Sequence, residues 1–230
     1  MPDFTAFEQK AGLNFSNKEI LKQAFVHRSY INENKGSGLS HNERLEFLGD
    51  AVLELVITDF LYHKYADKNE GELTAYRSAL VNAQTCSDIA TRLSVNDFLL
   101  LSKGESKDVG RARQYILANT LEAIIGAIYL DHGYDDAKAF IERNFTPLID
   151  SIVSAGSWID AKSLFQEKAQ EFDGVTPSYK TIKETGPDHE KKFTVGVYIG
   201  KELVASGEGV SKQDAEQSAA RAALAIRGWN

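Results

Sequence analysis

Two acidic residues on one predicted helix are the first side chains of this sequence that could carry out chemistry. Glu46 and Asp50 are four positions apart, so on a helix their carboxylates lie one above the other, and Glu43 falls on the same side. Like charges at this spacing repel one another unless a positive charge lies between them. The acids therefore mark either a solvent-exposed helix edge or a site for a cation.

The helix that must position these acids is predicted from its apolar residues. They recur at steps of three and four, the period of a helix that packs on one side: Leu45, Leu48, Val52, Leu55 and Val56. Gly49 lies between the two acids, in a helix interior where glycine costs up to ~1 kcal/mol relative to alanine. A glycine at this place indicates that another group approaches the backbone closely, which favours the cation site.

A second helix with a carboxylate is predicted over residues 115–131, YILANTLEAIIGAIYLD. Apolar residues cover it on nearly every side, so it should be buried. Asn119 and Glu122 are three positions apart and share one face. An isolated buried carboxylate is very costly, and a cation shared with Glu46 and Asp50 would give Glu122 a partner. These residues predict a metal site between two helices.

Composition limits the class of protein. At 230 residues, 43% hydrophobic and 26% charged, the chain suits one large soluble domain or two small ones. No apolar run approaches the ~18 residues that span a bilayer, and the N-terminus lacks a secretory signal, so we expect a cytoplasmic protein without membrane contact. The single cysteine, Cys86, excludes an internal disulfide and a multi-cysteine zinc cluster. A net charge of −7 argues against RNA binding by bulk charge, so any RNA contact must come from local placement of lysines and arginines.

The order of predicted elements divides the chain into two domains. The first, residues 1–153, is all-α, with a loop over 30–40 and with helices over 4–11, 16–26, 42–65, 72–93, 96–101, 115–131, 135–144 and 147–153. Residues 154–159 form a linker, because they begin with the small, flexible sequence SAGS. The second, residues 160–230, is a small α+β domain of order α-β-β-β-α. Its helices cover 161–172 and 212–226, and its strands cover 178–184, 192–200 and 202–206.

Three stretches resemble one known family. NERLEFLGD, at Asn42–Asp50, is similar to the signature of ribonuclease III, and residues 115–131 look like the second catalytic motif of that family. A GxG followed by SKQDAEQSAA resembles the double-stranded-RNA-binding domain, which would cover Asp160–Arg227. The resemblance extends over essentially the whole chain. It implies an endoribonuclease that hydrolyses phosphodiester bonds of double-stranded RNA, leaves staggered ends with 5′-phosphate and 3′-hydroxyl groups, and processes ribosomal, messenger and transfer RNA precursors.

The resemblance also implies a divalent cation, Mg²⁺ with Mn²⁺ as the alternative. Glu46, Asp50 and Glu122 match the acids of the two motifs and are expected to bind it, with Asp50 and Glu122 nearest the chemistry as catalytic residues. Asn119 stands where many members carry aspartate, and we expect it to be a fourth metal ligand through its neutral oxygen.

Two further acids match acidic positions of the family. For Glu43 and Glu70 we expect supporting or structural roles rather than direct contact with the metal. Family members are symmetric homodimers, and Phe47 matches a position at the dimer contact; from spacing alone, a core phenylalanine would be the preferred interpretation. No small-molecule substrate is implied.

In the second domain, the resemblance implies three regions that contact A-form RNA. They are the first helix, the loop Gly186–Glu190 and the start of the second helix, and the residues expected to touch RNA are Gln166, Glu167, Pro187, His189, Lys212 and Gln213. Gln213 stands where a second lysine is common. With 10 basic and 11 acidic residues from Asp160 to the end, this domain is not basic overall.

Two other functions compete with this interpretation. A non-catalytic double-stranded-RNA-binding protein could keep the same fold, and Asn119 is the motif residue that favours it. A metal-dependent phosphohydrolase of another helical class would be expected to carry paired histidines, which this sequence lacks. The acids of the two motifs favour the nuclease over both.

Overall fold

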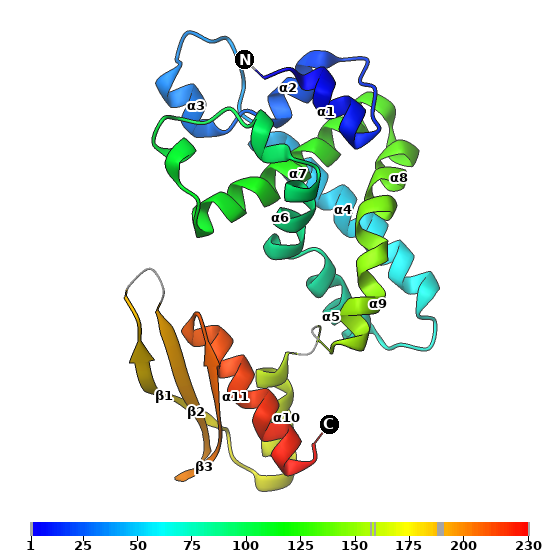
Figure 1. The fold of residues 1–230 in the computed structure, drawn as a ribbon. Helices are drawn as coiled ribbons and strands as arrows, with labels where there is room; N and C mark the ends of the chain where they lie inside the picture. The colour runs from blue at the N-terminus through cyan, green and yellow to red at the C-terminus, as the bar shows by residue number, and fades with distance from the viewer. Residues whose placement is uncertain (1, 157, 159, 188–190, 230) are drawn as a thin grey trace. The chain divides into compact units, whose positions relative to one another are not determined.

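The computed structural model describes residues 2–156, 158, 160–187 and 191–229. The chain forms two compact units, Met1–Trp158 and Ile159–Asn230. The first is built from helices and the second contains a three-stranded sheet (Figure 1). None of the helices in the described part of the chain combines the length and the apolarity needed to span a bilayer.

The first unit has the all-α fold predicted from the sequence. Its α-helices are α1 (Phe4–Ala11), α2 (Lys18–Ala24), α3 (Arg28–Glu33), α4 (Glu43–Lys64), α5 (Glu70–Leu80), α6 (Ala83–Arg92), α7 (Arg111–His132), α8 (Tyr134–Phe145) and α9 (Ile149–Ser154). Short 3₁₀ turns lie at Val95–Phe98, Glu105–Lys107 and Thr146–Leu148.

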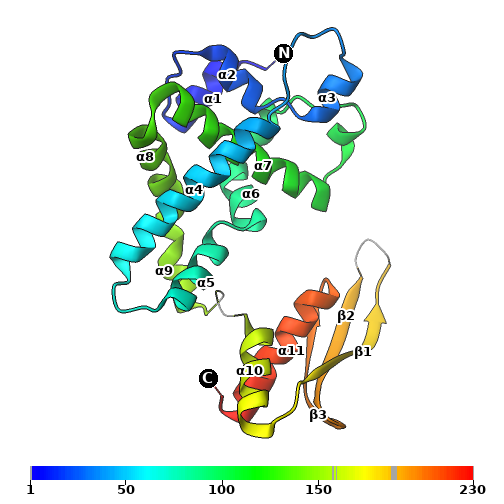
Figure 2. The same ribbon diagram turned by 180° about the vertical axis from the view of Figure 1, so that it is seen from behind.

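Two long helices, α4 and α7, form the centre of this unit. Figure 2 shows α4 crossing α7, with the shorter helices arranged around the pair. Leu53 and Ile57 of α4 and Leu121 and Ile124 of α7 are completely buried. Because burial of apolar surface is the main force that holds helices together, this crossing forms the centre of the core of the unit.

Glycines allow α4 and α7 to touch backbone to backbone. A Cβ atom added to Gly49 would lie 1.8 Å from the carbonyl oxygen of Glu122, and one added to Gly126 would lie 2.2 Å from the carbonyl oxygen of Leu45. No other residue type fits at either position. The close approach predicted from Gly49 is confirmed, and the group that approaches is the backbone of α7.

Several local predictions were wrong for identifiable reasons. Residues 72–93 form two helices, because the side chain of Asn82 accepts a hydrogen bond from the N–H of Thr85 and starts α6. The helix predicted from residue 16 begins only at Lys18, because the side chain of Asn17 caps α2. Part of the predicted loop over residues 30–40 is helical, as α3. Leu55, assigned to the buried stripe of α4, is 57% exposed.

The second unit has the predicted order of elements. It consists of α10 (Ala161–Asp173), β1 (Ser178–Thr185), β2 (Lys192–Ile199), β3 (Glu202–Gly209) and α11 (Lys212–Arg227). The strands pair antiparallel in the order β1-β2-β3, and the helices lie on one face of the sheet (Figure 2). The two glycines of the GxG sequence are required because α11 packs directly on β3. A Cβ at Gly207, for example, would lie 2.1 Å from the backbone nitrogen of Ala219.

Candidate active site

The crossing of α4 and α7 brings the carboxylates of the two helices together. Glu46 and Asp50 project from α4 close enough to Glu122 of α7 to act on its ionisation. Burial, together with the charges of Asp50 and Glu46, raises the pKa of Glu122 to about 8. Burial likewise raises the pKa of Glu46, with added repulsion from Glu43 and Asp50. These acids lie together at the edge of the core, where burial and mutual repulsion disfavour their negative charge.

No basic side chain in the described residues neutralises this charge. The ion pairs found there leave Glu46, Asp50 and Glu122 without a lysine, arginine or histidine partner. Nor do three acidic, histidine or cysteine side chains in that part of the chain converge tightly enough to enclose a metal ion as they stand.

Asn119 lies on α7, three positions before Glu122 and on the same face. It is half-buried, and its amide oxygen is a neutral oxygen donor beside the acids. The helix therefore presents one carboxyl group and one amide oxygen on that face.

Glu43 and Glu70 lie near opposite ends of α4 and have different neighbours. The carboxylate of Glu43 forms an ion pair of 3.3 Å with Arg28 and lies 3.6 Å from the ring of His41, so it already has basic neighbours. Glu70 begins α5, where its oxygen accepts a hydrogen bond from the hydroxyl of Thr74. It borders the far end of α4, ~22 Å along the helix from Glu46 at 1.5 Å per residue, so it does not join the acids of the two motifs.

Phe47 lies at the surface, so the core position favoured by spacing alone is wrong. Its side chain is 81% exposed, and Leu55 and Tyr62 are exposed on the same side of α4. Beside this stripe, a cavity of about 440 Å³ lies between α4 and α5, with Leu61 and Leu73 in its lining. An exposed apolar stripe next to an apolar cavity is typical of a protein–protein contact.

The residues expected to touch RNA lie on the surface of the second unit. Gln166 and Glu167 of α10, Pro187, and Lys212 and Gln213 in the first turn of α11 are all exposed. His189 lies outside the described residues. Lys212 forms an ion pair of 3.1 Å with Glu184 of β1 and lies over the ring of Phe193.

Two residues near the acids escaped the sequence-based reasoning. Gly126 was overlooked, although a glycine in a helix apolar on every side is a signal of close packing. Cys86 of α6 is buried so near the acids that Glu122 and Asp50 add to the burial that raises the pKa of its thiol. A thiol held neutral in this way is inert, and it supplies apolar surface behind the acids.

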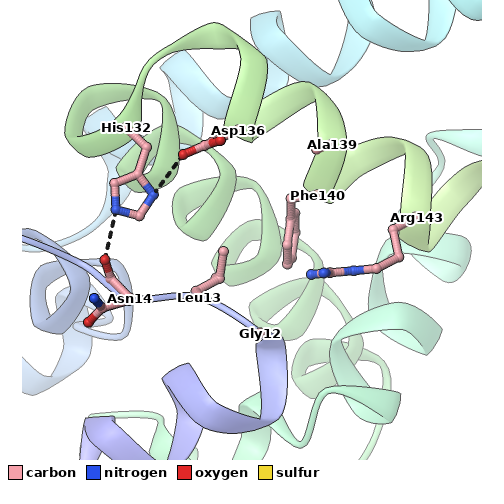
Figure 3. Close-up of a pocket in the computed structure, with 8 residues that line it drawn as sticks. All are labelled: Gly12, Leu13, Asn14, His132, Asp136, Ala139, Phe140 and Arg143. Carbon is pink, nitrogen blue, oxygen red and sulfur yellow. Dashed lines mark hydrogen bonds and ion pairs between the residues drawn. The ribbon is translucent and has the colours of Figure 1, made fainter.

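The hollow drawn in Figure 3 is a different feature. This cleft of about 320 Å³ lies between the α1–α2 connection and α8. Its polar side chains are already engaged in hydrogen bonds within the protein. The ring of His132 hydrogen bonds to the carbonyl of Asn14 at 3.0 Å. Arg143 donates to the carbonyl of Ala11 at 2.6 Å. It contains none of the residues predicted to act in catalysis.

Comparison with known proteins identifies the family. Residues 17–149 match the family described as Ribonuclease-III-like, and residues 161–226 match the double-stranded RNA binding motif. Ribonuclease 3 of Borreliella burgdorferi is 44% identical over 218 residues, which cover 95% of this chain and 89% of that protein. Ribonuclease 3 of Listeria monocytogenes is 41% identical over 227 residues, which cover 97% of each chain. The solved nuclease domain of ribonuclease III from Campylobacter jejuni matches 63% of this chain and 99% of its own, with a TM-score of 0.56 and 42% identity.

This chain belongs to the ribonuclease III family. It is an endoribonuclease that joins a helical nuclease domain to a double-stranded-RNA-binding domain. The family predicted from the two acidic motifs and from the SKQDAEQSAA sequence is confirmed, and the comparisons favour the enzyme over a non-catalytic binding protein.

Proposed function

We propose that Glu46, Asp50 and Glu122 bind a divalent cation, Mg²⁺ or alternatively Mn²⁺, with which the protein hydrolyses double-stranded RNA to 5′-phosphate and 3′-hydroxyl ends. One observation carries this proposal: the half-buried Glu46 and Glu122 and the exposed Asp50 lie near enough to one another to raise the pKa of Glu122 to about 8, and no basic side chain of the described residues neutralises them. Carboxylate oxygens are the ligands that Mg²⁺ prefers, so the donor set fits the ion.

The carboxylates have separate tasks in this proposal. The bound ion would supply hydroxide from water and neutralise charge on the reacting phosphate. Asp50 and Glu122 would hold it from the two crossing helices, and Glu46 would be the third ligand. Glu43, through its contact with Arg28, fixes the first turn of α4. Cleavage of a simple RNA duplex with Mg²⁺ and with EDTA tests the proposal, which fails if cleavage proceeds equally in both.

The neutral oxygen of Asn119 should weaken the site for its ion. Asn119→Asp adds one negative charge beside Glu122, so we expect it to lower the Mg²⁺ concentration that gives half the maximal rate and to change the saturated rate little. Titration of Mg²⁺ against cleavage rate for both forms measures this. If the wild type were inactive at every Mg²⁺ concentration and Asn119→Asp restored cleavage, Asn119 would be a disabling substitution instead.

We also propose that the protein is a homodimer formed through the exposed face of α4. A two-fold axis pairs the same surface on both chains. If the two α4 helices pack antiparallel across this axis, Phe47 near the start of one helix lies beside the C-terminal end of the partner's helix. The cavity lined by Leu61 opens at that end, so it can receive the Phe47 side chain. Glu70 borders that cavity, so the same pairing places it near the partner's acids, which gives it the supporting role expected from the sequence. The Campylobacter jejuni nuclease domain is itself described as having a region involved in dimer formation.

Phe47→Asp should convert the dimer to a monomer. The side chain is 81% exposed in one protomer, so the substitution leaves that protomer folded but puts a charge into the proposed contact. Light scattering on the full chain at micromolar concentration measures the change. Val109→Asp is the control, since Val109 is 92% exposed and lies in the loop before α7. A Phe47→Asp protein that remains as dimeric as the control would exclude this face.

In the second unit, we propose that the exposed residues of α10, the β1–β2 loop and the start of α11 bind duplex RNA by shape rather than by sequence. The match to the double-stranded RNA binding motif and the exposure of Lys212 support this. Such a domain supports action on structured precursors of ribosomal, messenger and transfer RNA in the cytoplasm.

Lys212→Ala should weaken binding to all duplexes alike. The loss of one phosphate contact should flatten the slope of log affinity against log salt by about one unit, and the loss should be the same for unrelated sequences. Fluorescence anisotropy with two duplexes over a salt series measures both effects. Lys201→Ala, an exposed lysine in the β2–β3 turn, is the control. A loss confined to one duplex would show that bases are being recognised.

A further inference from the structure

Asn42, the residue directly before α4, is buried, and its side chain does not cap that helix. Asn42 is 3% exposed, and its side chain makes no capping hydrogen bond. An asparagine at a helix start ordinarily accepts a hydrogen bond from an N–H of the first turn. Here the side-chain Nδ2 donates to the carbonyl of Ala24 instead, at 3.0 Å. The side chain therefore ties the start of α4 to the end of α2.

Two more hydrogen bonds hold the residues before α4 in the same place. The backbone N–H of Asn42 donates to the carbonyl of Val26 at 2.9 Å, and the side-chain amide of Gln23 donates to the carbonyl of His41 at 3.1 Å. Val26 in turn forms a β-bridge with Leu100, so the segment is fixed from its other side as well. Helix α4 thus starts from an anchored point.

The anchor acts directly on the turn that carries the first acid. The carbonyl of Asn42 accepts the backbone N–H of Glu46 at 2.9 Å. Contact through Gly49 lets α4 and α7 approach, but glycine has no side chain to fix the rotation of one helix against the other, and apolar packing has no preferred direction. Hydrogen bonds are directional.

We infer that Asn42 is a positioning residue for RNA cleavage. By fixing the rotation of the first turn of α4, it aims Glu46 and Asp50 at Glu122. This inference rests on the roles proposed above for those three acids.

Two substitutions at this position separate positioning from helix initiation. Asn42→Ala removes both the tie and any capping ability, whereas Asn42→Ser is a good helix cap whose side chain is too short to reach Ala24. At saturating Mg²⁺ and RNA, and well below the melting temperature, we expect kcat to fall about tenfold or more in both variants. Duplex binding measured in EDTA should stay unchanged. Gln23→Ala removes a weaker bond of the same anchor and should show a smaller fall in kcat.

Asn17→Ala is the matched control, because Asn17 starts α2 with an ordinary cap and its loss should cost about 1 kcal/mol of stability without changing kcat. The inference is overturned if Asn42→Ser cleaves at the wild-type rate, since the residue would then serve only to start the helix. It is also overturned if the kcat of the Asn42 variants falls only in proportion to the fraction of unfolded protein. If the Asn42 variants do not fold, Gln23→Ala becomes the test, and a wild-type kcat for Gln23→Ala then overturns the inference. Failure of the proposed metal site would be seen separately, as wild-type cleavage in EDTA.

Discussion

Replacing Glu122 by glutamine is expected to abolish RNA cleavage while leaving duplex binding intact. The amide has the same size, so the crossing of α4 and α7 is preserved, but the group that contributes charge from α7 is gone. We expect the cleavage rate at saturating RNA to fall by about 100- to 1,000-fold, the size of loss seen when one group that stabilises transition-state charge is removed. Single-turnover cleavage of a labelled duplex measures the rate, and anisotropy measures the binding.

Glu142→Gln is the control for this substitution, because Glu142 lies on α8 and pairs with Lys138 rather than with the acids. It should cleave at the wild-type rate. A Glu122→Gln protein that cleaves within a few-fold of the wild type would remove Glu122 from the site, and one that loses duplex binding as well would show a folding defect rather than a catalytic one.

Replacing Gly49 by alanine is expected to break the helical domain. The added Cβ would lie 1.8 Å from the carbonyl oxygen of Glu122, and because both partners are helix backbone, neither can move aside alone. Inserting a methyl group into packed interiors ordinarily costs ~1–3 kcal/mol, and this contact is more severe, so we expect a loss of at least about 3 kcal/mol. Gly126→Ala should act in the same way, since its Cβ would meet the carbonyl of Leu45.

Gly36→Ala is the matched control for both glycines, because a Cβ at Gly36 meets nothing within 4 Å. Chemical unfolding followed by circular dichroism compares the variants. If Gly49→Ala were as stable as Gly36→Ala, the two helices would not be in backbone contact, and the position of Glu122 beside Glu46 would lose its structural basis.

The sequence was sufficient to predict both domains and the helices that carry the acids. The helix α4 was predicted from the period of its apolar residues and α7 from apolar residues on nearly every side, and both extend over about six turns, with ends within a few residues of those predicted. The break at Asn82 was hidden, because helical periodicity continues across it and only the local hydrogen bond to Thr85 divides the helix.

The arrangement of the acids could be predicted only in part. Spacing placed Glu46 above Asp50 on one helix, but their nearness to Glu122 depends on the glycine contact between helices far apart in sequence. Spacing also placed Phe47 in the core, because spacing alone does not show which apolar residues stay at the surface. Asn42 was read as part of a motif, and its bond to Ala24 could not be foreseen from spacing.

The raised pKa of Glu122 has a consequence for the metal-free protein. The pKa moves from 4.5 to about 8 on folding, so the folded state holds a proton that the unfolded state has released between these values. Stability in EDTA should therefore decline as pH rises from about 4.5 to about 8, and Glu122→Gln should lack this part of the decline. A bound cation should offset the repulsion between Glu122 and the carboxylates of Asp50 and Glu46.

The central claim is that the carboxylates of α4 and α7 hold a divalent cation, and the melting temperature of the helical domain with and without Mg²⁺ tests it most directly. In the wild type, Mg²⁺ at a hundred times its Kd should raise the melting temperature by about 5–10 °C over that in EDTA. Glu122→Gln should start from a higher melting temperature in EDTA and gain little from Mg²⁺. An equal rise in both proteins would place the cation elsewhere and contradict the account.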